Sequence, residues 1–244
     1  MTNSIDEIQD SACIFVIGSN TTSSHPLVAT RIFRAKQKGA KLVVADPRKI
    51  QLASDADLYL RQNLGSDVAL LNGMMHVILE RNWHDPDFID GRTEGFEEFR
   101  KVVADYPPEK CAEITGIPAE EIIKAAELFG TAETATIIYC MGITQHTTGV
   151  DNVKSLANLA MLTGNVGREA TGVDPLRGQN NVQGACDMGG LPNVYPGYQP
   201  VTTLDSQKKF ADAWNAELSD QLGRTIPEML DGLSDGSVKA LYVM

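Results

Sequence analysis

The strongest constraint on the fold is an alternation, from residue 12 to residue 162, of short continuous apolar runs with longer amphipathic segments. The runs end at turn-forming residues such as Gly18 and Asp46, which is typical of strands buried on both faces of a parallel sheet. Between them, apolar residues recur at helical spacing. Strand, helix, strand in this order predicts right-handed βαβ units. We therefore predict an α/β fold with a Rossmann-like, doubly wound, mostly parallel sheet, followed by part of a second α/β domain.

The expected elements follow from these periods and from the turn residues between them. Strands are predicted at residues 12–17, 41–45, 57–61, 136–140 and 239–243, and helices at 26–38, 67–81, 95–106, from about 118, 150–162, 206–214 and 226–230. The regular alternation ends near Gln179. We therefore place a domain boundary there, with a Rossmann-like domain over residues 1–179 and the start of a second, incomplete α/β domain over residues 180–244.

Charge and cysteine content exclude several classes of protein. The net charge of −11 argues against nucleic-acid binding. There is no signal-peptide pattern and no apolar run of transmembrane length, from which we expect a cytoplasmic protein without a membrane segment. The four cysteines form no C-x-x-C pair, so neither a zinc ribbon nor an iron–sulfur cluster is expected here, and we assign no metal ligand in this chain.

Four polar segments lie where predicted strands end or lead into helices: residues 18–20, 46–48, 65–67 and 141–142. Ligands of open α/β sheets bind outside the carboxyl ends of the strands, so these segments should line one edge. The G-x-G-x-x-G fingerprint is absent, which disfavours simple NAD binding. The sequence therefore predicts a nucleotide crevice of another kind.

Two aspartates of this edge have two interpretations each. Asp46 is equally consistent with a ribose-binding carboxylate and with a turn residue. Asp67 could accept paired hydrogen bonds from guanine, but its position at a helix start alone favours a carboxylate stabilised by the helix dipole.

Residues 174–190 combine an arginine, four side-chain amides and four glycines, with no apolar period of either kind. We expect an irregular loop, and its composition favours a binding loop over a polar surface loop. Arg177 supplies paired donors that fit a carboxylate or a phosphate.

The run from Pro175 to Gly189, which reads PLRGQNNVQGACDMG, resembles the substrate loop of molybdenum- or tungsten-dependent formate dehydrogenases. These enzymes carry two molybdopterin guanine dinucleotides, and the resemblance extends over most of the chain. It implies that the chain is a fragment. The 4Fe-4S domain and the cysteine or selenocysteine that ligates the metal would precede it, and further pterin-binding domains would follow.

The resemblance also implies roles for individual residues. Arg177 would orient formate beside the metal, and Gln179 would hydrogen-bond the pterin. The guanosine end of one cofactor would be held by Asp46, Arg48, Gly65 and Asp67, with Gly18, Asn20, Gly142 and Gln145 completing the wall. Formate would be oxidised to carbon dioxide, and electrons would leave through the pterin and the iron–sulfur cluster to an electron-transfer subunit.

Two alternatives remain open at this stage. The chain could belong to a related molybdopterin oxidoreductase with another substrate, such as a nitrate reductase, although Arg177 favours a carboxylate. It could also be a non-catalytic module that binds a nucleotide or a protein. Because the metal ligand and its neighbouring histidine would lie outside the chain, we expect these 244 residues alone to be inactive.

Overall fold

The computed structural model describes residues 1–243, and the chain divides into two compact units after Leu176. We call residues 1–176 unit 1 and the part from Arg177 onward unit 2. The boundary expected after Gln179 lies just inside unit 2. The assignment of residues 1–179 to a cofactor-binding domain and of residues 180–244 to the start of a second α/β domain stays a prediction.

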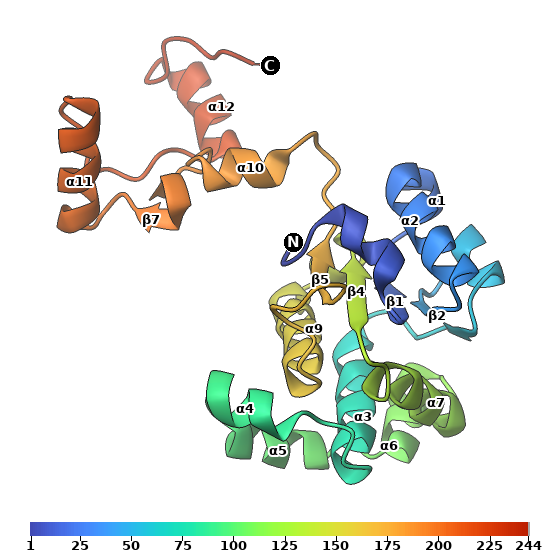
Figure 1. The fold of residues 1–244 in the computed structure, drawn as a ribbon. Helices are drawn as coiled ribbons and strands as arrows, with labels where there is room; N and C mark the ends of the chain where they lie inside the picture. Colours follow the sequence, from blue (N-terminus) through green and yellow to red (C-terminus); the bar gives the residue numbers. More distant parts are fainter. Residues whose placement is uncertain (244) are drawn as a thin grey trace. The chain divides into compact units, whose positions relative to one another are not determined.

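Unit 1 contains one five-stranded sheet, in which all neighbouring strands are parallel (Figure 1). The strands are β1 (Cys13–Ile17), β2 (Lys41–Ala45), β3 (Leu58–Leu60), β4 (Ala135–Tyr139) and β5 (Gly172–Pro175). Their order, β3-β2-β1-β4-β5, places β1 at the centre, so that the chain crosses to opposite sides of β1 to build the two halves. The predicted Rossmann-like α/β fold is confirmed.

Helices cover both faces of this sheet, which explains why its strands read as continuous apolar runs. Phe15 of β1 packs into a core formed with α3 (Asp67–Glu80), α7 (Ala119–Gly130) and α9 (Gly149–Leu162). Ile14 and Val16 point to the other face and pack in a core with η1 (Ile5–Asp10) and α2 (Pro26–Gln37). The remaining helical elements of unit 1 are α1 (Thr21–Ser24), η2 (Gln51–Ser54), α4 (Pro86–Arg92), α5 (Phe96–Ala104), α6 (Pro108–Thr115) and α8 (Met141–Thr144).

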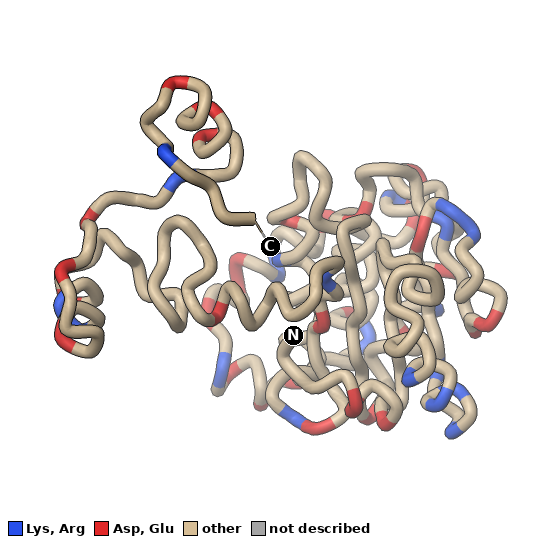
Figure 2. The backbone as a smooth tube through the Cα atoms, turned by 90° about the horizontal axis from the view of Figure 1, so that it is seen from above, with Lys and Arg blue, Asp and Glu red and all other residues tan. Residues whose placement is uncertain are grey.

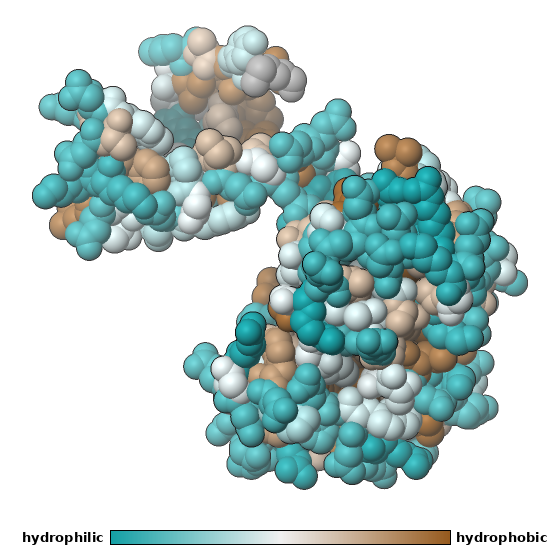
Figure 3. Space-filling view, viewed as in Figure 1, coloured by the Kyte–Doolittle hydropathy of each residue, from teal (hydrophilic) through white to brown (hydrophobic). Residues whose placement is uncertain are grey.

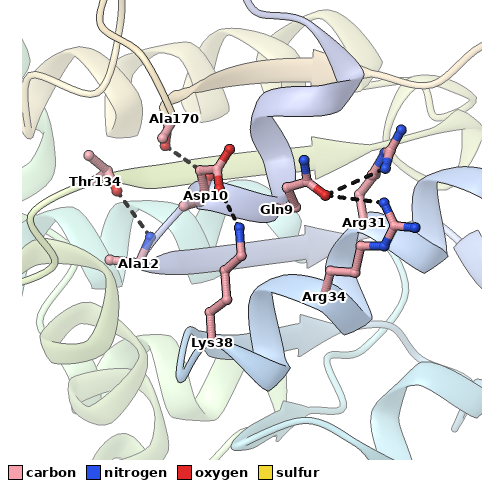
Figure 4. A network of polar contacts seen from close by, with 9 residues as sticks. Gln9, Asp10, Ala12, Arg31, Arg34, Lys38, Thr134 and Ala170 are labelled. Atoms are coloured by element: carbon pink, nitrogen blue, oxygen red, sulfur yellow. Dashed lines mark hydrogen bonds and ion pairs between the residues drawn. The ribbon is translucent and has the colours of Figure 1, made fainter.

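Polar side chains fasten η1 to α2, as Figure 4 shows. Arg31 and Arg34 both donate to Oε1 of Gln9 at 3.4 Å, and Lys38 pairs with Asp10. The Arg34 and Lys38 contacts are exposed, so each contributes little to stability, and the Arg31 contact is partly buried. Acidic and basic residues are interspersed in both units (Figure 2).

The first residues of unit 1 lie beside its last strand. The backbone N–H of Thr2 donates to the carbonyl of Val173 at 3.2 Å, and the Val173 N–H donates to Oγ1 of Thr2 at 2.9 Å. The two ends of the unit are therefore hydrogen-bonded to each other at one edge of the sheet.

Unit 2 is built from short elements around an aromatic cluster. Tyr195 and Trp214 both pack on Phe210, with ring centroids 4.8 and 5.0 Å away. The elements are α10 (Val182–Asp187), β6 (Val194–Tyr195), η3 (Pro196–Tyr198), β7 (Gln199–Pro200), α11 (Leu204–Trp214) and α12 (Ile226–Asp235), with β6 and β7 antiparallel. Helix α12 exposes Ile226 and Leu230, and apolar residues are visible over it in Figure 3.

The strand predicted at residues 239–243 is wrong. No strand is formed there in the described part of the chain, and Tyr242 and Val243 are 84% and 78% exposed. An apolar run becomes a strand only when a neighbouring strand takes up its backbone hydrogen bonds.

The expectation of a wholly irregular loop at residues 174–190 is also wrong. Its first two residues end β5, a fifth strand that pairs with β4, and α10 lies in its middle. Strand β5 was missed because it is short and contains Gly172 and Pro175, which normally count against a strand.

None of the described helices is long and apolar enough to cross a membrane.

Candidate functional site

A cavity of about 150 Å³ opens at the carboxyl ends of the parallel strands in unit 1. It is formed by the turns that follow β1, β2, β3 and β4, together with the first residue of α3. We call it the edge cavity. Its lining residues are Gly18, Asp46, Pro47, Arg48, Gln62, Asn63, Leu64, Gly65, Asp67, Gly142 and His146.

Two glycines let the turns after β1 and β4 touch. The Gly142 N–H donates to the Gly18 carbonyl at 3.1 Å. A Cβ atom on Gly142 would lie 2.5 Å from that carbonyl oxygen, and Gly18 has a φ of +57°, which side chains disfavour. The glycines are therefore required where one wall of the edge cavity closes between β1 and β4.

Two buried carboxyl side chains line the edge cavity. Asp46 is 5% exposed and Asp67 is 4% exposed. The backbone N–H of Arg48 donates to Oδ1 of Asp46 at 2.8 Å. Burial raises the pKa of Asp46, the hydrogen bond and charge of Arg48 lower it, and the nearby Asp67 raises it further. The cavity thus presents hydrogen-bond acceptors to any ligand inside it.

Gln62 adds a third acceptor that the sequence did not reveal. Its side chain is 3% exposed, and Nε2 lies 3.2 Å from Oδ1 of Asp67. The other end of the amide, Oε1, is buried and receives no hydrogen bond from any residue that the structure describes. Its position between a predicted strand and a predicted helix start was the only available signal.

A wider groove of about 780 Å³ adjoins the edge cavity and shares Arg48 and Gln62 with it. Arg61 also lines this groove, and its Nε donates to the Pro47 carbonyl at 3.2 Å. We call it the arginine groove. Two guanidinium groups therefore line this groove in a chain whose net charge is −11, and guanidinium groups offer paired donors that fit anions such as a diphosphate.

The structure brings together most of the predicted site residues of unit 1. The edge cavity is lined by Gly18, Asp46, Arg48, Gly65, Asp67 and Gly142, whereas Asn20 and Gln145 are not among its lining residues. Asn20 precedes α1, where its carbonyl accepts from the N–H groups of Ser23 and Ser24, and Gln145 is exposed after α8.

Arg177 and Gln179 belong to unit 2, where both are exposed. The Arg177 charge lies near Tyr198. A hydrogen bond to Asp187 raises the pKa of Tyr198, and Arg177 opposes that shift. In the described part of the chain, no group of three or more His, Cys, Asp or Glu residues could hold a metal ion.

A second cavity, of about 240 Å³, lies among α4, α5 and α9. It is lined mainly by apolar residues such as Phe96, Phe99 and Met161. It lies away from the strand ends and has no converging charges, so the edge cavity is the better candidate for a nucleotide.

Comparison with known protein families shows the family to which the chain belongs. All of residues 1–244 match the family described as Molybdopterin oxidoreductase. The chain belongs to the molybdopterin oxidoreductase family.

Two formate dehydrogenases are similar to the chain over its whole length. It is 54% identical over 244 residues to the F420-dependent formate dehydrogenase subunit alpha of Methanocaldococcus jannaschii, covering 100% of this chain and 36% of that protein. It is 50% identical to formate dehydrogenase H of Escherichia coli, covering 100% of this chain and 34% of that protein. The chain thus spans about a third of the length of these relatives.

The solved structure of acetylene hydratase from Pelobacter acetylenicus is also similar. It aligns with a TM-score of 0.61 and 30% sequence identity, over 66% of this chain and 24% of that one. For a molybdopterin oxidoreductase, the residues of the edge cavity and arginine groove are chemically suitable for the nucleotide end of a pterin cofactor. Buried acceptors match the N–H groups of a base, and two arginines match a diphosphate.

Proposed function

We propose that the edge cavity binds the guanine ring of a molybdopterin guanine dinucleotide and that the arginine groove binds its diphosphate. One observation carries this proposal: residues with buried acceptor groups line the cavity, and the groove beside it is lined by two arginines. Asp67 would accept from guanine N1–H and the exocyclic amine, and Asp46 from a ribose hydroxyl. Arg48 and Arg61 would pair with the phosphates.

The other predicted residues fit this assignment in different ways. Gly18, Gly65 and Gly142 would shape the cavity through their backbone. Asn20 and Gln145 stay predicted cofactor residues, although another part of the dinucleotide would have to reach them.

We further propose that the whole protein is the catalytic subunit of a formate dehydrogenase that oxidises formate to carbon dioxide. The formate dehydrogenase relatives at 54% and 50% identity support this, as does Arg177 in the loop that resembles their substrate loop. Arg177 would bind and orient the formate carboxylate through its paired N–H donors, and Gln179 would hydrogen-bond the pterin. When bound, a molybdenum or tungsten centre between two such pterins supplies the acceptor for the two electrons of formate.

The proposal includes partners beyond these residues. Other domains of the same subunit would supply the metal ligand and a 4Fe-4S cluster, and an electron-transfer subunit would accept the electrons. The M. jannaschii relative is named as F420-dependent and the E. coli relative is not, so the names of the relatives leave the final acceptor open. A cytoplasmic location also stays a prediction.

A different reaction on the same fold is the main alternative, because one similar solved structure is an acetylene hydratase. The test uses the purified full-length protein with formate, nitrate and acetylene as separate substrates. We expect dye reduction with formate only, and a guanine nucleotide released from the denatured protein. Turnover of acetylene or nitrate without formate oxidation would refute the formate assignment, and absence of a guanine nucleotide would refute the cofactor assignment.

A further inference from the structure

The side-chain amide of Gln62 is buried beside Asp67. Nε2 of Gln62 donates a hydrogen bond to Oδ1 of Asp67 at 3.2 Å, so the amide nitrogen is the end that faces Asp67. The carbonyl oxygen Oε1 is then the other end. It is buried and receives no hydrogen bond from residues 1–243, and Gln62 lines the edge cavity together with Asp67.

A buried acceptor without a donor is costly, and native proteins rarely keep one unless water or a ligand completes it. We infer that Gln62 is a specificity-determining residue that selects a purine with an amino group at C2 by accepting one of its N–H bonds. This inference rests on the proposed binding of guanine in the edge cavity and assigns a second residue to the recognition of that base.

Guanine supplies the donors that Asp67 and Gln62 together require. Asp67 would accept from N1–H and from one hydrogen of the exocyclic amine, which leaves the second amine hydrogen to be accepted. Oε1 of Gln62 lies on the same carboxylate–amide pair and would accept it. Hypoxanthine lacks the amine, and adenine turns an acceptor nitrogen toward Asp67. The expected order of affinity is therefore guanine, hypoxanthine and then adenine.

The experiment measures binding of GDP, IDP and ADP by calorimetry to the purified full-length protein after removal of its cofactor. We expect GDP to bind at least about tenfold more tightly than IDP, because loss of the amine removes a contact with each of Asp67 and Gln62. In Gln62→Met, the ratio of GDP to IDP affinity should fall by about five- to tenfold. Loss of the Nε2–Asp67 hydrogen bond weakens the contact between Asp67 and N1–H in both nucleotides, and that part of the effect cancels in this ratio.

Three controls make the result decisive. Gln37→Met, at the exposed end of α2, should keep the wild-type ratio. Gln62→Leu repeats the test with a second apolar side chain, and thermal unfolding checks that each variant is folded. Asp67→Ala should lose most GDP binding, which tests the proposed function separately.

The outcomes separate the two claims. A wild-type chain that does not prefer GDP to IDP, or a Gln62→Met variant that keeps the full ratio, would overturn the inference. In the second case, loss of GDP binding in Asp67→Ala would leave the proposed function standing. A chain that binds no GDP, or an Asp67→Ala variant that binds GDP as wild type does, would overturn both.

Discussion

Replacing Asp174 by asparagine should stabilise unit 1 most strongly above neutral pH. Asp174 lies in β5 opposite Ile138, is completely buried, and neither carboxylate oxygen has a well-formed hydrogen bond among the described residues. Burial raises the pKa of Asp174 to about 7, although the nearby backbone of Asn3 and Thr2 lowers it in part. The ionised form is therefore poorly accommodated in the folded unit.

The magnitude follows from linkage between folding and proton binding. The pKa of Asp174 rises from 3.8, the ordinary value of an aspartate, to about 7 in the folded unit. Each unit of pKa corresponds to about 1.4 kcal/mol, so the ionised side chain costs about 4 kcal/mol. Between these two values the folded state binds more protons than the unfolded state. The free energy of unfolding is therefore highest below the lower value, decreases as pH rises, and levels off above the upper value. The gain in unfolding free energy from Asp174→Asn should be about 2–3 kcal/mol larger at pH ~8.5 than at pH ~5.

The assay is urea unfolding at a series of pH values. The chain has two tryptophans, and Trp83 lies in unit 1 and Trp214 in unit 2. In a Trp214→Phe background, tryptophan fluorescence therefore follows unit 1 alone. Asp90→Asn changes an exposed carboxylate of α4 and should show no comparable pH-dependent gain. A difference between Asp174→Asn and its parent that does not vary with pH would refute the reasoning.

Three further predictions concern other parts of the chain. Gly142→Ala should destabilise unit 1 by about 1–3 kcal/mol in the same assay, because the added Cβ would collide with the Gly18 carbonyl. Gly91→Ala has open space around its Cβ and should not lower the free energy of unfolding, so equal effects of the two substitutions would contradict this account. Arg177→Lys in the full-length enzyme should lower kcat/KM for formate strongly and leave metal content intact, since lysine keeps the charge but loses the paired donors; unchanged kinetics would remove Arg177 from the site. Hydrogen exchange should be slow in β1 and β4 and fast in residues 177–190, which are mostly exposed; strong protection there would show that this segment is stably packed.

The parts of the fold that could be predicted are those whose signal lies within one segment. β1 reads as a continuous apolar run because Phe15 and Ile14 face two different helical layers, so no polar side is needed. The position of the edge cavity followed from a general rule about parallel strands, which fixes where their carboxyl ends meet. Residues directly after those strands, such as Asp46, were therefore identifiable.

What could not be predicted depends on partners distant in sequence. Strand β5 exists because β4 offers a free edge to pair with, and the run at residues 239–243 is no strand because nothing pairs with it in the described chain. Gln62 looks like an ordinary polar connector until folding buries it against Asp67. The role proposed for Gln62 rests on an amide oxygen that receives no hydrogen bond from residues 1–243, which no sequence pattern encodes.

The hydrogen bonds between Thr2 and Val173 make unit 1 a candidate cassette for protein engineering. Because residue 2 is hydrogen-bonded to the last strand of the unit, a short linker between residues 2 and 176 could join the two ends into a ring. New ends opened at the exposed residues Glu94 and Gly95, between α4 and α5, would leave every sheet contact in place. The same geometry would allow the unit to be inserted into a surface loop of another protein, so that the sheet and its edge cavity could be transferred together.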